Sequence, residues 1–128
     1  MFLQGQKVGK YEIIRSLGSG GFGSVYLARD TWLEVKVAIK VPHKQSSELY
    51  KLLKEPRLQA ALNHPNIVRM IAAEKENRVF FMVMEYVKGK TLEKIVEKEG
   101  TLDWTRAVDL VRQVTQGVEH AHNNKIIH

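Results

Sequence analysis

Apolar and polar residues alternate along five stretches of the first 87 residues, and such alternation predicts β-strands. The pattern is most regular over residues 34–41, where every second residue is valine or isoleucine. The last stretch is apolar on both faces, which is typical of a strand inside a sheet. The expected strands cover residues 11–17, 24–29, 34–41, 67–73 and 78–87.

Apolar residues at helical spacing appear in three other stretches, residues 46–63, 91–98 and 103–124. The texture changes from strand to helix at residues 88–90, which makes "KGK" the best internal boundary. The predicted fold class is therefore α+β. We expect a five-stranded antiparallel sheet with one helix in residues 1–87, followed by two helices in residues 88–128.

Pro56 conflicts with the helix expected over residues 46–63. An interior proline removes an N–H donor, clashes with the preceding turn and costs about 3 kcal/mol. Two arrangements resolve the conflict. The helix kinks near Leu52, or a new helix begins with Pro56 at its first position, where proline is accepted.

Composition narrows the class of protein. The 128 residues are 44% hydrophobic, enough for a packed core, and fit one domain or a piece of a larger one. The chain has no cysteine, which excludes disulfides and thiolate metal sites. No signal peptide or stretch of transmembrane length is visible, so we expect a cytoplasmic protein without a membrane segment.

The net charge of +6 raises the question of nucleic-acid binding. No run of basic residues is interleaved with aromatic ones, so we expect a solvated basic surface and no nucleic-acid partner. The spacing of His64, His120 and His122 does not fit a metal site, and we expect none. His64 is expected to cap a turn.

The stretch "SLGSGGFGSVYLARD" places four glycines within residues 18–23. Their G-x-G-x-x-G pattern also marks dinucleotide-binding sites, but there a helix begins within the glycines, whereas residues 24–29 are predicted to be a strand. Two interpretations remain. The loop is a ligand-free flexible hairpin, or its bare amides clasp phosphates, with Phe22 shielding them and Val25 pressing on a ring.

Further motifs follow in register. "VAIK" places Lys40 seventeen residues after Gly23, and Glu55 lies fifteen residues beyond Lys40. "LNHPNIVRM", "MVMEYVKGKTL" and "AHNNKIIH" come next. Together with the glycine loop, these motifs resemble the protein kinase family from about Tyr11 to His128, and in texture the bacterial serine/threonine kinases most. The resemblance implies an ATP-binding N-lobe and hinge in residues 1–87 and a partial C-lobe in residues 88–128.

The resemblance also implies roles. Lys40 would pair with the α- and β-phosphates of ATP. Glu55 would hold the Lys40 ammonium in place, unless Pro56 alters how Glu55 approaches Lys40. Ala38 and Val25 would bracket the adenine, Leu17 would close its edge, and Met84 would be the gatekeeper, although ordinary core packing is the alternative for all four. The expected catalytic residues are Lys40 and Glu55. The expected nucleotide-binding residues are Leu17, Gly18, Ser19, Gly20, Gly21, Phe22, Gly23, Val25, Ala38, Lys40, Met84 and the hinge residues Glu85, Tyr86 and Val87.

The sequence given stops at His128, which matches only the first letter of the kinase catalytic loop. We therefore expect the N-terminal fragment of a serine/threonine kinase that is inactive alone. The base and the ligands for Mg²⁺, which the full-length enzyme is expected to use, have no counterpart here. The alternative is a non-catalytic, pseudokinase-like module that binds nucleotide or a regulatory partner.

The resemblance implies a protein substrate for the parent kinase. A second partner is expected from the last helix, whose apolar stripe would face a larger lobe that is missing here. We expect this helix to drive self-association into an oligomer. The stripe consists of Leu110, Val111, Val114, Val118 and Ala121.

Overall fold

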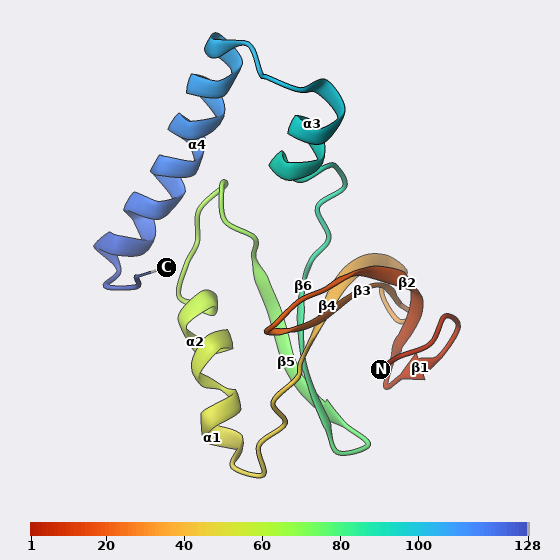
Figure 1. Cartoon of the computed structure of the whole chain (residues 1–128). Coiled ribbons are helices and arrows are strands. Elements are labelled where there is room, and N and C mark those ends of the chain that lie inside the picture. Colours follow the sequence, from red (N-terminus) through yellow and green to blue (C-terminus); the bar gives the residue numbers. More distant parts are fainter. Residues whose placement is uncertain (128) are drawn as a thin grey trace. The chain divides into compact units, whose positions relative to one another are not determined.

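The computed structural model describes residues 1–127 (Figure 1). His128, the first residue of the expected catalytic-loop motif, lies outside the described residues. The chain divides into two compact units. The sheet unit comprises residues 1–61 and 69–86, and the helical unit comprises residues 62–68 and 87–128. Within residues 1–127, no helix combines the length and the apolar character needed to cross a membrane.

The sheet unit contains one antiparallel sheet with the strand order β1-β2-β3-β4-β6-β5. The five expected strands are confirmed, and β6 lies inside the sheet as its apolar faces predict. The sheet has six strands and not five. The sixth, Lys7–Val8, turns at Gly9 (φ 56°) and pairs with β2, and it is too short to show alternation in the sequence. The strands are β1 (Lys7–Val8), β2 (Tyr11–Ser19), β3 (Gly23–Asp30), β4 (Val35–Pro42), β5 (Met70–Glu76) and β6 (Val79–Glu85).

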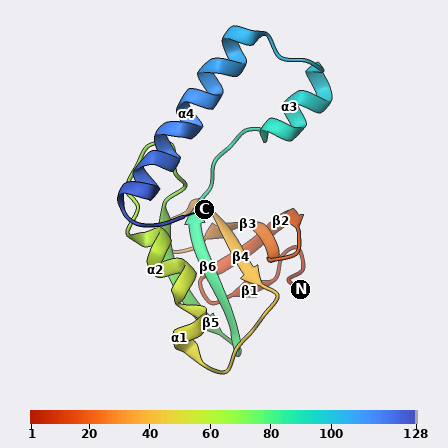
Figure 2. The ribbon, with the colours of Figure 1, turned by 60° about the vertical axis from the view of Figure 1, so that its left-hand side comes forward.

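The sheet is curled (Figures 1 and 2). One of its faces forms the hydrophobic core. Tyr11 and Phe81 meet edge to face, with their ring centroids 6.0 Å apart. The Tyr11 hydroxyl donates a 2.9 Å hydrogen bond to Glu74 and so joins β2 to β5. Burial, the hydrogen bond to Glu74 and the charges of Glu74 and Asp30 all raise the pKa of Tyr11, so its hydroxyl stays protonated. The core cluster contains Val8, Tyr11, Ile13, Tyr26, Ala28, Val37, Ile39, Phe81 and Val83.

The helix expected over residues 46–63 is interrupted near Leu52, and the alternative in which a new helix begins with Pro56 at its first position is wrong. The structure has two short helices, α1 (Leu49–Leu52) and α2 (Lys54–Ala60), separated at Leu53. Pro56 is the third residue of α2, within the first turn, where backbone N–H groups have no partner in the helix. The break therefore lies close to the predicted kink, and it removes the cost of an interior proline.

The helical unit contains α3 (Leu92–Glu99) and α4 (Trp104–Asn123), close to the expected bounds. Thr91 caps α3 by accepting the backbone N–H of Lys94 at 3.2 Å. The segment 62–68 packs on α4, where the side-chain amide of Asn66 donates to the backbone carbonyl of Gln113 at 2.9 Å. His64 accepts the backbone N–H of Asn66 at 3.0 Å, which confirms its role in the turn.

Candidate nucleotide-binding site

The sheet register brings the expected nucleotide-contacting side chains onto one face. Val25 lies opposite Lys40, and Ala38 lies opposite Met84. Cross-strand partners share a face, and successive residues of a strand alternate between faces. Because Ile39 lies in the core, its neighbours Ala38 and Lys40 occupy the opposite face, and their partners Val25 and Met84 lie there with them.

Lys40 and Glu55 meet on this face. The Nζ atom of Lys40 lies 2.5 Å from a carboxylate oxygen of Glu55, which is the second residue of α2. The Lys40 side chain is 23% exposed and that of Glu55 is 54% exposed. An ion pair this open adds little stability, so its significance is that Glu55 holds the ammonium in one position.

The four glycines of residues 18–23 differ in their surroundings. A Cβ added to Gly18, Gly20 or Gly21 would meet no heavy atom within 4 Å, whereas one on Gly23 would lie 2.3 Å from the Val41 carbonyl oxygen. Gly23 is therefore required for the close approach of β3 to β4, a role that the motif did not reveal. The other three glycines leave the backbone bare toward open space, as a phosphate clasp requires.

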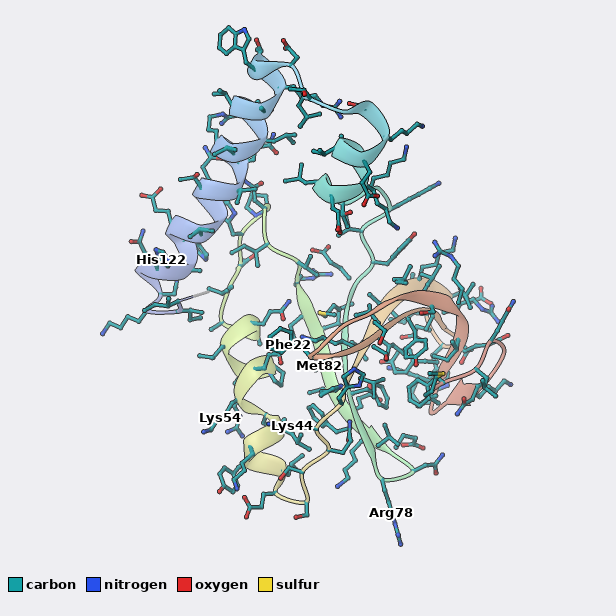
Figure 3. All side chains as sticks on the ribbon, in the orientation of Figure 1. Phe22, Lys44, Lys54, Arg78, Met82 and His122 are labelled. Atoms are coloured by element: carbon teal, nitrogen blue, oxygen red, sulfur yellow. The ribbon has the colours of Figure 1, made fainter. Side chains whose placement is uncertain are left out.

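Residues at the two sides of this loop close the hairpin. Gly18 and Ser19 end β2, and the hydroxyl oxygens of Ser19 and Ser24 lie 3.2 Å apart across the two strands. Phe22 projects from the tip and is 86% exposed (Figure 3). Nothing in the sheet unit covers its ring, which leaves it available to shield a ligand.

Leu17 lies at an irregularity of the sheet. Its neighbours Ser16 and Gly18 pair with the consecutive residues Tyr26 and Val25, so Leu17 is an extra residue on β2. It is half-buried. Such bulges bend a strand and redirect a side chain, and they are common beside functional sites. The bulge therefore sets the direction of the Leu17 side chain next to the glycine loop.

The expected hinge begins at the end of β6. Glu85 donates its backbone N–H to the carbonyl of Arg69 at 3.0 Å, and its carboxylate accepts the backbone N–H of Arg69 at 2.9 Å. The N–H of Glu85 is thus engaged with Arg69 and is not one of the hinge groups that can read a purine edge. Tyr86 is the last residue of the sheet unit, and Val87 begins the helical unit.

His43 is a residue of the site that the sequence analysis missed. One of its ring nitrogens, Nε2, lies 2.7 Å from the carbonyl oxygen of Gly20, and its backbone N–H donates to the carbonyl of Phe22 at 3.2 Å. The register of β3 against β4, once known, identifies His43, because Gly23 pairs with Pro42. The residue after Pro42 therefore lies opposite the residue before Gly23.

A cavity of about 620 Å³ lies between the loop tip, the end of β4 and helices α1 and α2. Of the expected site residues, Gly21, Phe22 and Glu55 line this cavity, whereas Lys40 and the residues expected to contact adenine do not. Glycine amides and the Lys40 ammonium are the groups suited to the phosphates of ATP. Mg²⁺ is not accounted for, because residues 1–127 contain no group of three or more His, Cys, Asp or Glu side chains that could hold a metal ion. The cavity is lined by Gly21, Phe22, Pro42, His43, Lys44, Ser46, Lys51, Leu52 and Glu55.

Known proteins are similar to this chain in sequence. Serine/threonine-protein kinase PrkC of Bacillus subtilis (strain 168) is 36% identical over 124 residues, which are 94% of this chain and 19% of that protein. Serine/threonine-protein kinase pkn2 of Myxococcus xanthus is also 36% identical, over 94% of this chain and 15% of that protein. The chain thus spans about a fifth of the length of the curated relatives it matches.

A solved structure gives the same fold. The kinase domain of PknI from Mycobacterium tuberculosis superposes with a TM-score of 0.78 at 21% identity, over 100% of this chain and 54% of that one. Residues 11–128 match the protein kinase domain as a family. This match spans the glycine loop, Lys40, Glu55 and the expected hinge. The chain belongs to the protein kinase domain family.

Proposed function

We propose that residues 1–128 are the ATP-binding part of a cytoplasmic serine/threonine protein kinase. The observation that carries the proposal is the contact between Lys40 and Glu55 on the sheet face bordered by the glycine loop. Its two partners come from different elements, β4 and α2. Lysine and glutamate paired in this way orient an ammonium group toward phosphates.

The remaining residues contact different parts of ATP. The Gly20 amide already donates to the Gly23 carbonyl, so other amides of residues 18–23 donate to the phosphates, and Phe22 excludes water from them. The apolar side chains of Val25 and Ala38 hold the adenine, Leu17 closes its edge and Met84 lies behind it. The main-chain groups of the hinge, Glu85, Tyr86 and Val87, hydrogen-bond the purine edge.

The full-length kinase would transfer the γ-phosphate of ATP to a hydroxyl of a protein substrate. Phosphoryl transfer depends on positioning and on neutralising charge, which requires a base and Mg²⁺ ligands. Residues 1–128 contain no counterpart of these residues. We therefore expect residues 1–128 alone to bind ATP without transferring phosphate to protein.

Titration with a non-hydrolysable ATP analogue tests the site. Lys40→Ala is expected to weaken binding about 10-fold or more, because it removes charge-assisted hydrogen bonds to phosphate. Glu55→Gln should cause a smaller loss, since the ammonium remains but is no longer held by a charge. Lys36→Ala is the matched control, because Lys36 is an exposed lysine on the same strand. Equal binding by the Lys40→Ala and Lys36→Ala variants would contradict the proposal.

Self-association is proposed on a separate observation. Large apolar side chains of α4 are exposed, namely Trp104, Val108, Val111, Val114 and Val118. The predicted stripe is divided by the structure, because Ala121 is buried and Leu110 is half-buried. Apolar side chains in water favour a second copy of the chain as partner. Sedimentation at micromolar concentration should show a dimer or larger species, and Val111→Asp should shift it toward monomer. A wild-type chain that sediments only as a monomer would refute this.

A further inference from the structure

His43 makes two contacts to the glycine loop that no role above explains. Its ring bonds the carbonyl of Gly20 and its backbone N–H bonds the carbonyl of Phe22. We propose that His43 is a positioning residue that clamps the glycine loop in the conformation that receives the nucleotide phosphates. The inference rests on the nucleotide site proposed above.

The chemistry of the contact fixes the donor. A carbonyl oxygen only accepts hydrogen bonds, so Nε2 of His43 must carry a proton at the 2.7 Å contact with Gly20. The second contact extends the ladder between β3 and β4 by one residue past the Gly23–Pro42 pair. His43 thus holds the loop through its side chain and through its backbone.

The two contacts flank Gly21 and determine where its amide points. In a trans peptide, the C=O group and the following N–H group point in opposite directions. Holding the Gly20 carbonyl against the His43 ring therefore directs the Gly21 N–H away from that ring. Holding the Phe22 carbonyl does the same for the N–H of Gly23. One residue thereby orients two amides of the loop, of which that of Gly21 belongs to the proposed phosphate clasp.

A clamp matters here because Gly21 and Phe22 lie outside the one backbone hydrogen bond that closes the hairpin, from the Gly20 N–H to the Gly23 carbonyl at 3.0 Å. A Cβ on Gly20 or Gly21 would meet nothing within 4 Å, so neighbouring atoms do not restrict these residues. Glycine has the largest conformational freedom of any residue, and that freedom must be lost when a ligand binds. A loop that is ordered before the ligand arrives avoids this cost at binding and raises affinity.

The proposal concerns hydrogen bonding and not the charge of the pocket. Lys44, Lys51 and Glu55 line the same cavity as His43. Lys44 is the next residue along the chain and is exposed (Figure 3). The Lys44→Ala variant therefore removes a neighbouring positive charge without removing a contact to Gly20.

The experiment compares four variants of the chain: His43→Ala, His43→Phe, His43→Gln and Lys44→Ala. Nitrogen-15 relaxation without nucleotide reports the mobility of Gly20, Gly21 and Phe22. Titration with adenylyl imidodiphosphate then reports affinity. His43 is exposed, so these changes leave the core intact.

The Ala and Phe variants should lower the order parameters of the loop from about 0.85 toward 0.6 or below. They should also weaken binding about 3- to 10-fold, as expected for one lost hydrogen bond. His43→Gln, which keeps an N–H donor of similar reach, should restore both quantities. Lys44→Ala should leave the loop order parameters unchanged.

The results separate this proposal from the nucleotide site itself. Unchanged loop order in the Ala and Phe variants overturns the clamp, whether or not the chain binds nucleotide. A more mobile loop with unchanged affinity overturns its positioning role. A wild-type chain that does not bind the analogue refutes the nucleotide site, and the clamp as a positioning residue is refuted with it.

Discussion

The sheet unit and the helical unit follow their hydrophobic patterns equally well but bury them to very different degrees. Tyr11, Ile39 and Phe81 of the sheet unit are almost completely buried. In the helical unit, Trp104 and Val111 are among several large apolar side chains that remain exposed, and Ala121 is the only apolar residue of that unit in the buried core of residues 1–127.

The difference shows that a hydrophobic pattern determines whether a segment forms a helix or a strand, but not what that segment packs against. Each strand of the sheet unit pairs with a neighbour, and the core cluster joins five of its strands. Helix α4 has few described tethers, namely the segment 62–68 and an ion pair between Arg106 and Glu99 at the end of α3. Since most helical stability comes from packing an amphipathic face, the helical unit should be the less stable of the two.

The largest expected effect comes from changing one apolar residue in each unit. Phe81→Ala should destabilise the sheet unit by about 3–5 kcal/mol, because Phe81 is fully buried and packs edge to face on Tyr11. Val96→Ala on α3, at an exposed residue outside the α4 surface proposed to self-associate, should change stability by less than about 0.5 kcal/mol. Urea unfolding can be followed by unit, because Trp32 and Trp104, the only two tryptophans, lie one in each. A similar cost for both variants would break the comparison.

A smaller effect, of opposite sign in the two units, is expected from replacing glycine by alanine. Gly23→Ala should cost about 1–3 kcal/mol, because its Cβ would collide with the carbonyl of Val41. Gly117→Ala should stabilise α4 by up to about 1 kcal/mol, because alanine is the better helix former. The Cβ at position 117 would meet its nearest atoms, in Asn66 and Ile67, at 3.4 Å. Thermal unfolding of the two variants measures both effects. Destabilisation by Gly117→Ala would mean that segment 62–68 packs too rigidly on α4 to admit a methyl group.

The smallest expected effect is the pH dependence of Asp30. Burial raises the pKa of Asp30, but hydrogen bonds from the backbone N–H groups of Leu33 and Trp32, together with Lys10, outweigh it and lower the pKa. The stabilisation is therefore complete above the unfolded pKa of about 3.9 and is lost as pH falls through the lower folded pKa. Asp30→Asn should cost about 1 kcal/mol at pH 7 and less below pH 4.

The control for this prediction lies in the helical unit. Hydrogen bonds from Arg112 and Gln113 lower the pKa of Asp109, but the carboxylate is exposed. Asp109→Asn should therefore have no measurable effect on the urea midpoint at either pH. A constant penalty for Asp30→Asn between pH 7 and pH 3 would show that its hydrogen bonds do not depend on its charge.

The sequence predicted the strands well because alternation is a local property that pairing then reinforces. Val37 and Ile39 lie in the core as their period of two requires. It did not predict β1, since two residues cannot show a period. It predicted that Pro56 disturbs a helix and that a kink near Leu52, close to the observed break at Leu53, is one outcome. It did not choose between this kink and a helix that restarts at Pro56, because the break is a property of the whole turn.

The site was predictable to the extent that its residues follow motifs. Lys40 and Glu55 come together although a proline follows Glu55, because Pro56 lies in the first turn of α2 and does not deflect that residue. The motif did not distinguish Gly23 from the other glycines, since the difference is a contact with β4. His43 belongs to no motif, and its contacts depend on strand register.

The path of the chain between the two units limits how this protein can be divided. Segment 62–68 lies in sequence between α2 and β5, yet it packs with α4. A polypeptide ending at residue 86 would thus retain Asn66 while losing the carbonyl acceptor that its amide uses. Cleavage at residues 86–87 would accordingly leave Asn66 on one half and its acceptor, the Gln113 carbonyl, on the other.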